Sequence, residues 1–411
     1  MAPPPRPSAQ LMLLAREKPL ILAGWLFAFV LAYGLLGGDL HYAFTHHGWR
    51  AGPGARLGRD FANMFTAGHL ILDGKLRIVY DVAAYRHYQL DLLHHTVINH
   101  NYSYPPVSFF YVWIFGLPGY GLSYLLWMGL TCALFFLAAR PYLREAGLPA
   151  WLALIAPAAL VNIWAGHYGF AFGALWLAAW RWLDERPRTA GLLIGLMIVK
   201  PHLALLMPLM LIFRRAWTPF FWAAATSLTL VIASGLIFGW SYWLTYLTST
   251  SSFQAAMINQ TQEFYLRMMP TVFPAMMLAG CGSALASIVQ VACGLGAVAA
   301  LWKWMPKNPM QAGLAAATAT FLVLPYAFNY DLTVVGLGAL IALHRADRPA
   351  EVAHRFGLTV AFLLPLLVVP MNMLGIPVAP PALIALLGLL LRRAHAADGE
   401  PAPVEWQPAL S

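Results

Sequence analysis

The chain has 411 residues, of which 60% are hydrophobic and only 10% are charged, whereas about a quarter of the residues in an average soluble domain carry a charge. This composition excludes an ordinary soluble globule, and the absence of regularly alternating polar and apolar residues argues against a transmembrane barrel. The net charge of +9 does not indicate nucleic-acid binding, because the basic residues sit in short segments between apolar runs.

Apolar runs close to the roughly 20 residues that cross a bilayer recur along the chain. The first run follows basic residues and lacks a cleavage site, so it is expected to be an uncleaved anchor. The runs before and after Lys200 and Pro201 are short, which predicts a bent or re-entrant pair lined by protein. The sequence thus predicts an all-α polytopic membrane protein with about twelve spans, at residues 19–36, 120–139, 150–163, 167–182, 190–200, 201–213, 217–239, 283–302, 311–327, 331–344, 356–374 and 376–391.

The distribution of basic residues predicts the orientation of these spans. With the N-terminus in the cytoplasm, 17 of the 25 Lys and Arg residues lie on the cytoplasmic side. Six of the other eight lie in the long first outer loop, where charge has little influence on topology. The expected organisation is one transmembrane domain with two long outer loops between two cytoplasmic tails: tail 1–18, domain 19–392 with loops 37–118 and 240–270, and tail 393–411.

The first outer loop contains a helical pattern after Asp60, in LGRDFANMFTAGHL. Phe61 and Phe65 share one face of this helix, whereas Asp60 and Asn63 share another, which predicts an amphipathic helix on or in the membrane surface. A second amphipathic stretch is expected at residues 80–97. The segment YSYPPVSFFYVWIFGLPG that follows is short and bounded by Pro, so it is expected to be interfacial or re-entrant.

An outward-facing reaction that needs a general base must use an acid on the outer side. Asp60 stands out because Arg59 beside it is suited to bind phosphate or to tune its ionisation. The alternative is a helix N-cap, for which Asp is a preferred residue. For Asp331, the acid in LPYAFNYDL, a helix cap is the favoured interpretation. The seven outer acids are Asp39, Asp60, Asp73, Asp81, Asp91, Glu263 and Asp331.

Lys200 lies between two strongly apolar segments, where an ammonium group is costly and is by default a functional candidate. The alternative interpretation is that Lys200 has no function and extends its charged end to the outer surface. His202 is two residues away, and His167 lies in the outer turn NIWAGHYGF. Together with Arg59, these three residues are predicted to line a polar outer pocket for an anionic headgroup.

Several other patterns argue against cofactors. Ten of the 13 histidines are on the outer side, but adjacent histidines such as His46 and His47 point in different directions on a helix and chelate poorly. Nucleotide-binding, nucleophile-elbow and zinc-protease motifs are absent from the sequence. We therefore expect no metal and no cofactor.

Two other features are expected to serve packing. Gly191 and Gly195, in GLLIG, have the spacing that lets helices pack closely. The three cysteines lie in apolar runs, where they are expected to be packing residues.

Five segments in order resemble glycosyltransferase family 87: GRDFANMFTAGHLILDGKLRIVYD, YPP, GHYGF, GLLIGLMIVKPHLALLMPLMLIFRRAW and LPYAFNYDL. The resemblance covers roughly residues 20–345 and implies a C-type glycosyltransferase fold in a bacterial inner membrane. A polyprenyl-phosphate sugar, often mannose, would donate its sugar to a lipid or glycan acceptor on the periplasmic face. The family's first-loop acid falls on Asp60. The predicted substrate-binding residues are Arg59, Asn63, Tyr104, His167, Lys200, His202, Asn329 and Asp331.

The chain departs from the family at some positions. Family members commonly carry Gln where this chain has His167, Gln or another polar residue where it has His202, and often His near Asn329 and Tyr330. The expected mechanism is a single displacement, in which Asp60 deprotonates the acceptor while Arg59 and Lys200, with His202, stabilise the departing lipid phosphate. Two rival functions are a transporter or flippase of a lipid-linked or anionic substrate, and a scaffold subunit whose outer loop binds a partner.

Overall fold

The computed structural model describes residues 33–46, 48–52, 54–95, 101–250, 264–346 and 352–399, together with residues 26, 29 and 30. The predicted tail at 1–18, most of the first span at 19–36 and the end of the second tail lie outside the described residues. The middle of the second outer loop, with Glu263, also lies outside them, as do His47 and His100.

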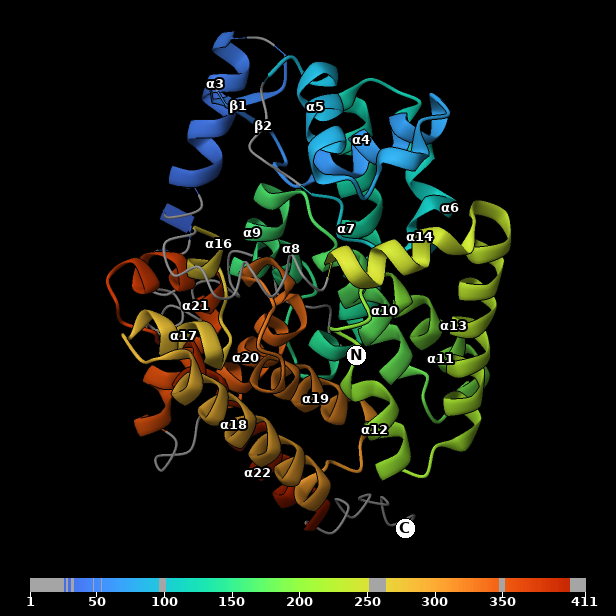
Figure 1. Cartoon of the computed structure of the whole chain (residues 1–411). Helices are drawn as coiled ribbons and strands as arrows, with labels where there is room; N and C mark the ends of the chain where they lie inside the picture. The colour runs from blue at the N-terminus through green and yellow to red at the C-terminus, as the bar shows by residue number, and fades with distance from the viewer. Residues whose placement is uncertain are drawn as a thin grey trace, which may run out of the picture.

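The predicted first outer loop forms a layer of short elements at one end of a helical bundle, drawn in blue and cyan in Figure 1. Two short antiparallel strands in this layer pair Arg50 with Arg56. The interfacial segment forms three consecutive helical pieces from Pro106 to Gly116 and is short, as predicted. The elements of the layer are η1 Tyr33–Gly37, α3 Gly38–His46, β1 Arg50–Gly52, β2 Ala55–Arg56, α4 Phe61–Leu72, η2 Leu76–Ile78, α5 Val82–Leu92, η3 Pro106–Ser108, α6 Phe109–Val112 and η4 Trp113–Gly116.

The rest of the described chain is the helical bundle. Its elements are α7 Tyr120–Glu145, α8 Leu152–Ile155, α9 Pro157–Ala165, α10 Gly169–Arg181, α11 Pro187–Leu196, η5 Met197–Val199, α12 Leu206–Phe213, α13 Trp217–Phe238, α14 Trp240–Thr245, η6 Tyr246–Thr250, α16 Phe264–Arg267, α17 Val272–Leu278, α18 Ser283–Trp304, α19 Pro309–Val323, η7 Asn329–Asp331, α20 Thr333–His344, α21 Val352–Met373 and α22 Ala379–Gly399.

Within the described residues, four helices are long and apolar enough to cross a membrane: Tyr120–Glu145, Trp217–Phe238, Ser283–Trp304 and Arg355–Met373. Most other predicted spans correspond to shorter apolar helices, so the twelve crossings stay a prediction. The predicted span 150–163 is wrong as one helix, because Pro157 begins a new helix, α9, after the short α8. Helix α22 continues to Gly399, beyond the predicted start of the tail at 393.

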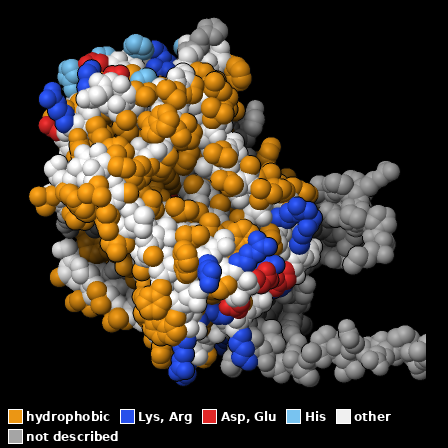
Figure 2. Space-filling view, turned by 90° about the vertical axis from the view of Figure 1, so that its right-hand side faces the viewer, with side chains coloured by type: hydrophobic (Ala, Val, Ile, Leu, Met, Phe, Trp, Pro, Cys, Tyr) orange, Lys and Arg blue, Asp and Glu red, His pale blue; other side chains and the backbone are white. Residues whose placement is uncertain are grey.

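Helices differ sharply in how much of their surface is covered. In α20, 11 of the 12 residues are buried, and its Gly and Ala residues let neighbouring helices approach closely. In α13, only four of the 22 residues are buried although the helix is strongly apolar. Figure 2 shows hydrophobic side chains over the broad middle of one face, with histidines and charges gathered toward its upper end and further charges low on the face. This apolar exterior identifies a membrane protein.

The predicted break at Lys200 is confirmed. Helix α11 passes through the 3-10 turn η5 to Lys200, whose backbone has φ −136° and ψ 69°, and α12 begins only at Leu206. Helix α11 packs closely on α13. A methyl group added at Gly191 would lie 2.5 Å from the Cβ atom of Trp222, which confirms that the glycine spacing serves helix packing.

The environment of α4 differs from the prediction. Nine of its 12 residues are buried, so the helix is embedded in protein on most sides and does not lie on the membrane surface with one face exposed. The reason is a close backbone approach to η4: a Cβ atom on Gly68 would lie 2.5 Å from the carbonyl oxygen of Val112. This tertiary contact buries a helix whose pattern suggested an amphipathic surface helix.

Candidate functional site

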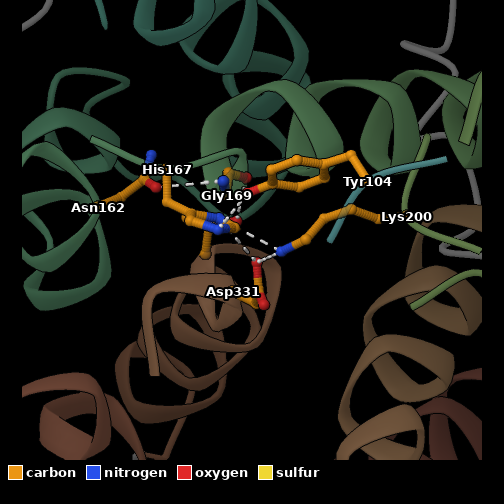
Figure 3. A network of polar contacts seen from close by, with 7 residues as sticks. Tyr104, Asn162, His167, Gly169, Lys200 and Asp331 are labelled. Atoms are coloured by element: carbon orange, nitrogen blue, oxygen red, sulfur yellow. Dashed lines mark hydrogen bonds and ion pairs between the residues drawn. The ribbon is translucent and has the colours of Figure 1, made fainter. Parts of the chain in front are cut away.

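Five segments that are distant in sequence meet between the outer layer and the bundle. They are the turn before α4, the loop before η3, the turn between α9 and α10, the break after η5, and the segment between α19 and α20. Figure 3 shows the centre of this site, where Tyr104, His167, Lys200 and Asp331 form a connected network. The site therefore depends on the complete fold.

A buried ion pair lies at the middle of the network. Lys200 donates a hydrogen bond from Nζ to Oδ1 of Asp331 across 2.7 Å, and the two side chains are only 6% and 1% exposed. Lys200 therefore does not extend to the surface. The helix-cap interpretation of Asp331 is wrong, because Leu332 precedes α20 and Asp331 instead neutralises the ammonium group. Two charges can be buried at this depth because they are paired.

The contacts of His167 indicate its protonation. Nδ1 lies 3.3 Å from Nζ of Lys200, and a lysine ammonium can only donate. Nδ1 is therefore the acceptor, and the proton sits on Nε2, which lies 2.7 Å from the hydroxyl of Tyr104. A neutral His167 thus links the outer loop to the ion pair.

Aromatic rings enclose this network. The Tyr330 ring stacks on His167 with centroids 4.0 Å apart, and Nζ of Lys200 lies 5.5 Å from the Tyr330 centroid. On the other side, Tyr104 and Tyr168 have centroids 4.6 Å apart. Tyr330 was not predicted as a site residue, although the aromatic residues immediately before Asp331 in LPYAFNYDL were a signal. The rings lower the local polarity and strengthen the polar contacts inside.

Asp60 lies at the edge of the same region. It occupies the N-cap position of α4, but its side chain makes no capping hydrogen bond, so the cap does not explain it. Its backbone N–H donates to the carbonyl of Ala165 across 3.0 Å. Next to this bond, a Cβ atom on Gly166, which has φ +68°, would lie 2.3 Å from the carbonyl oxygen of Gly58. These contacts fasten the acid's backbone to the turn that carries His167.

The ionisation of Asp60 responds to the network. Burial raises the pKa of its carboxyl to about 7, although the charges of Lys200 and Arg59 act in the opposite direction and Asp331 adds to the rise. Asp60 is therefore within electrostatic reach of the buried ion pair. The residue as a whole is half-buried.

Arg59 is held by partners that the sequence did not reveal. Both of its terminal nitrogens bond to the carboxylate of Asp39, in α3, and its guanidinium lies 4.0 Å from the ring centroid of Trp164. Arg59 has a positive φ of 20°. A bidentate pair and a stacked ring fix the orientation of the guanidinium, so Arg59 is a positioned cation beside Asp60.

Three other predicted residues occupy different surroundings. His202 contacts the ring of Tyr326, with centroids 5.9 Å apart. Asn329 donates from Nδ2 to the carbonyl of Pro365 across 2.9 Å. Asn63 donates to the carbonyl of Asn101 across 2.8 Å and accepts from the Tyr85 hydroxyl. Asn63 therefore stabilises the outer layer, and its polar atoms are already used.

Some buried polar atoms at the site have no hydrogen-bond partner within the described part of the chain. They include Oδ2 of Asp331, Oδ1 of Asn329 and Nδ2 of Asn162. Buried polar groups are nearly always paired in native proteins, so these atoms are candidates to bind a polar ligand. Two of the three atoms are acceptors, which fits the hydroxyl groups of a sugar. The described residues contain no group of three His, Cys, Asp or Glu side chains that would hold a metal ion.

The fold and this site define a helical membrane protein with a buried lysine–aspartate pair, a neutral histidine and a half-buried acid of raised pKa. A family model of glycosyltransferase family 87 matches residues 102–327, which is more than half of the chain, and the chain belongs to this family. It is therefore a membrane glycosyltransferase. The matched region includes Tyr104, His167, Lys200 and His202. Comparisons with curated proteins and with solved structures found no match.

Proposed function

We propose that this glycosyltransferase transfers mannose or another hexose from a polyprenyl-phosphate carrier to a lipid or glycan acceptor on the periplasmic face of the bacterial inner membrane. The observation that carries the proposal is the position of Asp60, a half-buried acid with a raised pKa beside fixed cations. The C-type glycosyltransferase fold is part of the same proposal. No cofactor is required, because the lipid-linked sugar is itself the activated substrate.

Asp60 is suited to act as the general base. A base works best when its pKa lies near the operating pH, since it is then both ionised and strongly basic. Burial brings the pKa of Asp60 to about 7, well above that of an ordinary Asp near 3.9. The side chain makes no capping hydrogen bond to α4, so we assign its role to the reaction and not to the helix terminus.

Lys200 and Arg59 are suited to receive the lipid phosphate. A lysine ammonium has three N–H groups, of which one bonds to Asp331 and one to His167. The third can donate to a phosphate oxygen without breaking the ion pair. Arg59 uses two nitrogens on Asp39 and has further N–H groups for the same ligand. Fixed donors of this kind stabilise charge that develops on a leaving group.

The unpaired acceptors are suited to orient the sugar. Oδ2 of Asp331 and Oδ1 of Asn329 would each accept a hydrogen bond from a sugar hydroxyl. In the proposed step, the acceptor oxygen forms a bond to the anomeric carbon as the bond from that carbon to the phosphate oxygen breaks. The acceptor proton passes to Asp60, and the lipid phosphate leaves with the bonding electron pair. The configuration of the anomeric carbon is inverted.

The test is a transfer assay with the purified chain. Polyprenyl-phosphate mannose, glucose and arabinose would be offered as donors with a bacterial lipid extract as the acceptor. Asp60→Asn is expected to lower transfer by about 100-fold or more, since general base catalysis contributes roughly 10²–10⁴-fold. Binding of polyprenyl phosphate is expected to change little. Asp73→Asn, at the other end of α4, is the matched control and should keep full activity.

Full activity of Asp60→Asn would remove the base assignment, and transfer from a nucleotide sugar alone would remove the lipid-linked donor. The transporter alternative is tested with the chain in vesicles, where movement of an intact lipid-linked sugar across the membrane without product formation would support it. The family supports transfer over transport.

A further inference from the structure

A cavity lies between α18, α19 and α22, and none of the residues that line it belongs to the site around Asp60. Its volume is about 640 Å³, which is within the usual range of roughly 300–1,000 Å³ for ligand pockets. Helices α18 and α22 contact each other along this cavity and run side by side in the lower left of Figure 1. Its walls are almost entirely apolar and include Cys293, Leu322 and Ile384.

The polar part of the cavity is confined to one end. Arg392 lines that end together with Trp304, and the lining contains no carboxylate. Nζ of Lys303 lies 4.9 Å from the Trp304 ring centroid, which places a second cation beside the same ring. A tryptophan flanked by cations is typical of the membrane–water interface. In the predicted orientation of the spans, this is the cytoplasmic interface.

Two glycines create the space. Gly296 in α18 and Gly388 in α22 both line the cavity, and a Cβ atom added to either would meet no other atom within 4 Å. Leu322 in α19, which is 2% exposed, is part of the lining as well. The cavity is thus an apolar crevice that opens beside two side-chain-free positions.

The depth of the crevice fits one leaflet of a bilayer. Cys293 and Trp304 are eleven residues apart on α18, which corresponds to about 16 Å along a helix. Half of the hydrocarbon core of a bilayer is about 15 Å thick. An acyl chain of an inner-leaflet lipid would therefore extend from Trp304 to Cys293, whereas a polyprenyl chain would be far longer than this distance.

We propose that this crevice between α18, α19 and α22 binds one acyl chain of an anionic phospholipid of the inner leaflet, with the lipid phosphate bound by Arg392. The proposal is independent of the transfer reaction. The charge of Arg392, without a carboxylate in the lining, selects an anionic headgroup over a zwitterionic one. The apolar walls require a lipid and not free phosphate.

The test uses the purified full-length chain in detergent micelles, titrated with dioleoyl-phosphatidylglycerol or dioleoyl-phosphatidylcholine. Bound lipid is counted by native mass spectrometry. The wild-type chain is expected to bind phosphatidylglycerol about five-fold more tightly than phosphatidylcholine, because one basic residue near an anionic lipid surface contributes about that factor to the affinity. Arg392→Gln is expected to abolish this preference.

Gly388→Leu and Gly296→Leu fill the crevice from α22 and α18. Each is expected to lower phosphatidylglycerol binding by roughly tenfold, because the new side chain displaces a few methylene groups of the acyl chain that would otherwise be buried. Leu favours a helix more than Gly does, so both variants should fold. Gly129→Leu is the matched control: Gly129 lies in α7, is exposed and also has no atom within 4 Å of an added Cβ. It should bind lipid as the wild type does.

Equal binding of both lipids, or unchanged binding in the two crevice variants, would overturn the proposal. Competition by polyprenyl phosphate at equal concentration would assign the crevice to the sugar donor instead. If lipid binding appeared only after removal of residues 400–411, that segment would be the occupant. A change of oligomeric mass in Gly388→Leu would indicate a second copy of the chain.

Discussion

Lys200 and Asp331 are 131 residues apart in sequence, yet Nζ of the one lies 2.7 Å from Oδ1 of the other at the centre of the site. Both side chains are almost completely buried. Removing one member of such a pair leaves an uncompensated charge, whereas replacing both by apolar residues is often tolerated. Single and double replacements of this pair can therefore show whether it is needed for stability, for sugar transfer or for both.

The first prediction concerns this separation. Asp331→Leu should lower the free energy of unfolding by about 3–5 kcal/mol, because the Lys200 ammonium is left unpaired. The double variant Lys200→Met with Asp331→Leu should recover most of that stability but should not transfer sugar. Thermal unfolding in detergent and the transfer assay measure the two effects. An active double variant would show that the pair is only structural.

The second prediction concerns pH. Asp60 must be ionised to accept a proton, and its pKa is raised to about 7 by burial. The ratio kcat/KM, which reports ionisation of the free enzyme, should therefore rise with pH through a midpoint near 7 and fall about tenfold per unit below it. The measurement is kcat/KM from pH 5 to pH 9.

Variants of Arg59 test the same assignment, because its positive charge lowers the pKa of Asp60. Arg59→Gln removes that charge, so the pKa of Asp60 rises and the midpoint should move to higher pH. Arg59→Lys keeps the charge and should leave the midpoint nearly unchanged. A rate that is flat across this range, or a shift of the midpoint to lower pH in Arg59→Gln, would contradict Asp60 as the base.

The third prediction concerns His167, which accepts from Lys200 and donates to Tyr104. Gln also has one acceptor and one donor group, so it can replace both contacts. His167→Gln should therefore keep most of the activity, while His167→Ala should lose about tenfold or more, since Lys200 loses a partner that orients it. Equal loss in both variants would instead indicate that the imidazole has a chemical role.

The fourth prediction concerns the close approach of Gly166 to the backbone of Gly58, beside Asp60. Gly166→Ala should destabilise the protein by about 1–3 kcal/mol from backbone strain and additionally by a clash, because the new methyl group would lie 2.3 Å from the carbonyl oxygen of Gly58. Gly74 is a matched control, since it has φ +66° but no atom within 4 Å of an added Cβ. Gly74→Ala should show the strain alone and keep full transfer activity. Similar unfolding temperatures for the two variants would rule out the clash.

The sequence identified features that depend on local chemistry. The break at Lys200 was predictable because a charge and a proline interrupt an apolar run, and the packing of Gly191 followed from its spacing. Asp60 was selected as a candidate base because an acid followed by a helical pattern is a recognisable signal. Each of these features could be predicted from the residues that neighbour it in the sequence.

Other features could not be derived from local patterns. The sequence favoured a cap for Asp331, because its partner Lys200 is distant and nothing nearby reveals the pair. The burial of α4 depends on the approach of Gly68 to Val112, which is a tertiary contact. Likewise, Arg59 was predicted to face a ligand directly, but its pairing with Asp39 required the arrangement of α3 over the turn before α4.

The order of these residues along the chain has a consequence for biosynthesis. Lys200 is made 131 residues before Asp331, so a growing chain holds the lysine without its counterion until four-fifths of the polypeptide exists. An unpaired lysine in a membrane helix costs about 2.5–3.5 kcal/mol during insertion. The weak helical character around Lys200, between η5 and α12, would let that segment remain near the water interface until the late helices arrive. Premature termination before Asp331 should therefore leave a product that inserts poorly and is a ready substrate for quality-control proteases.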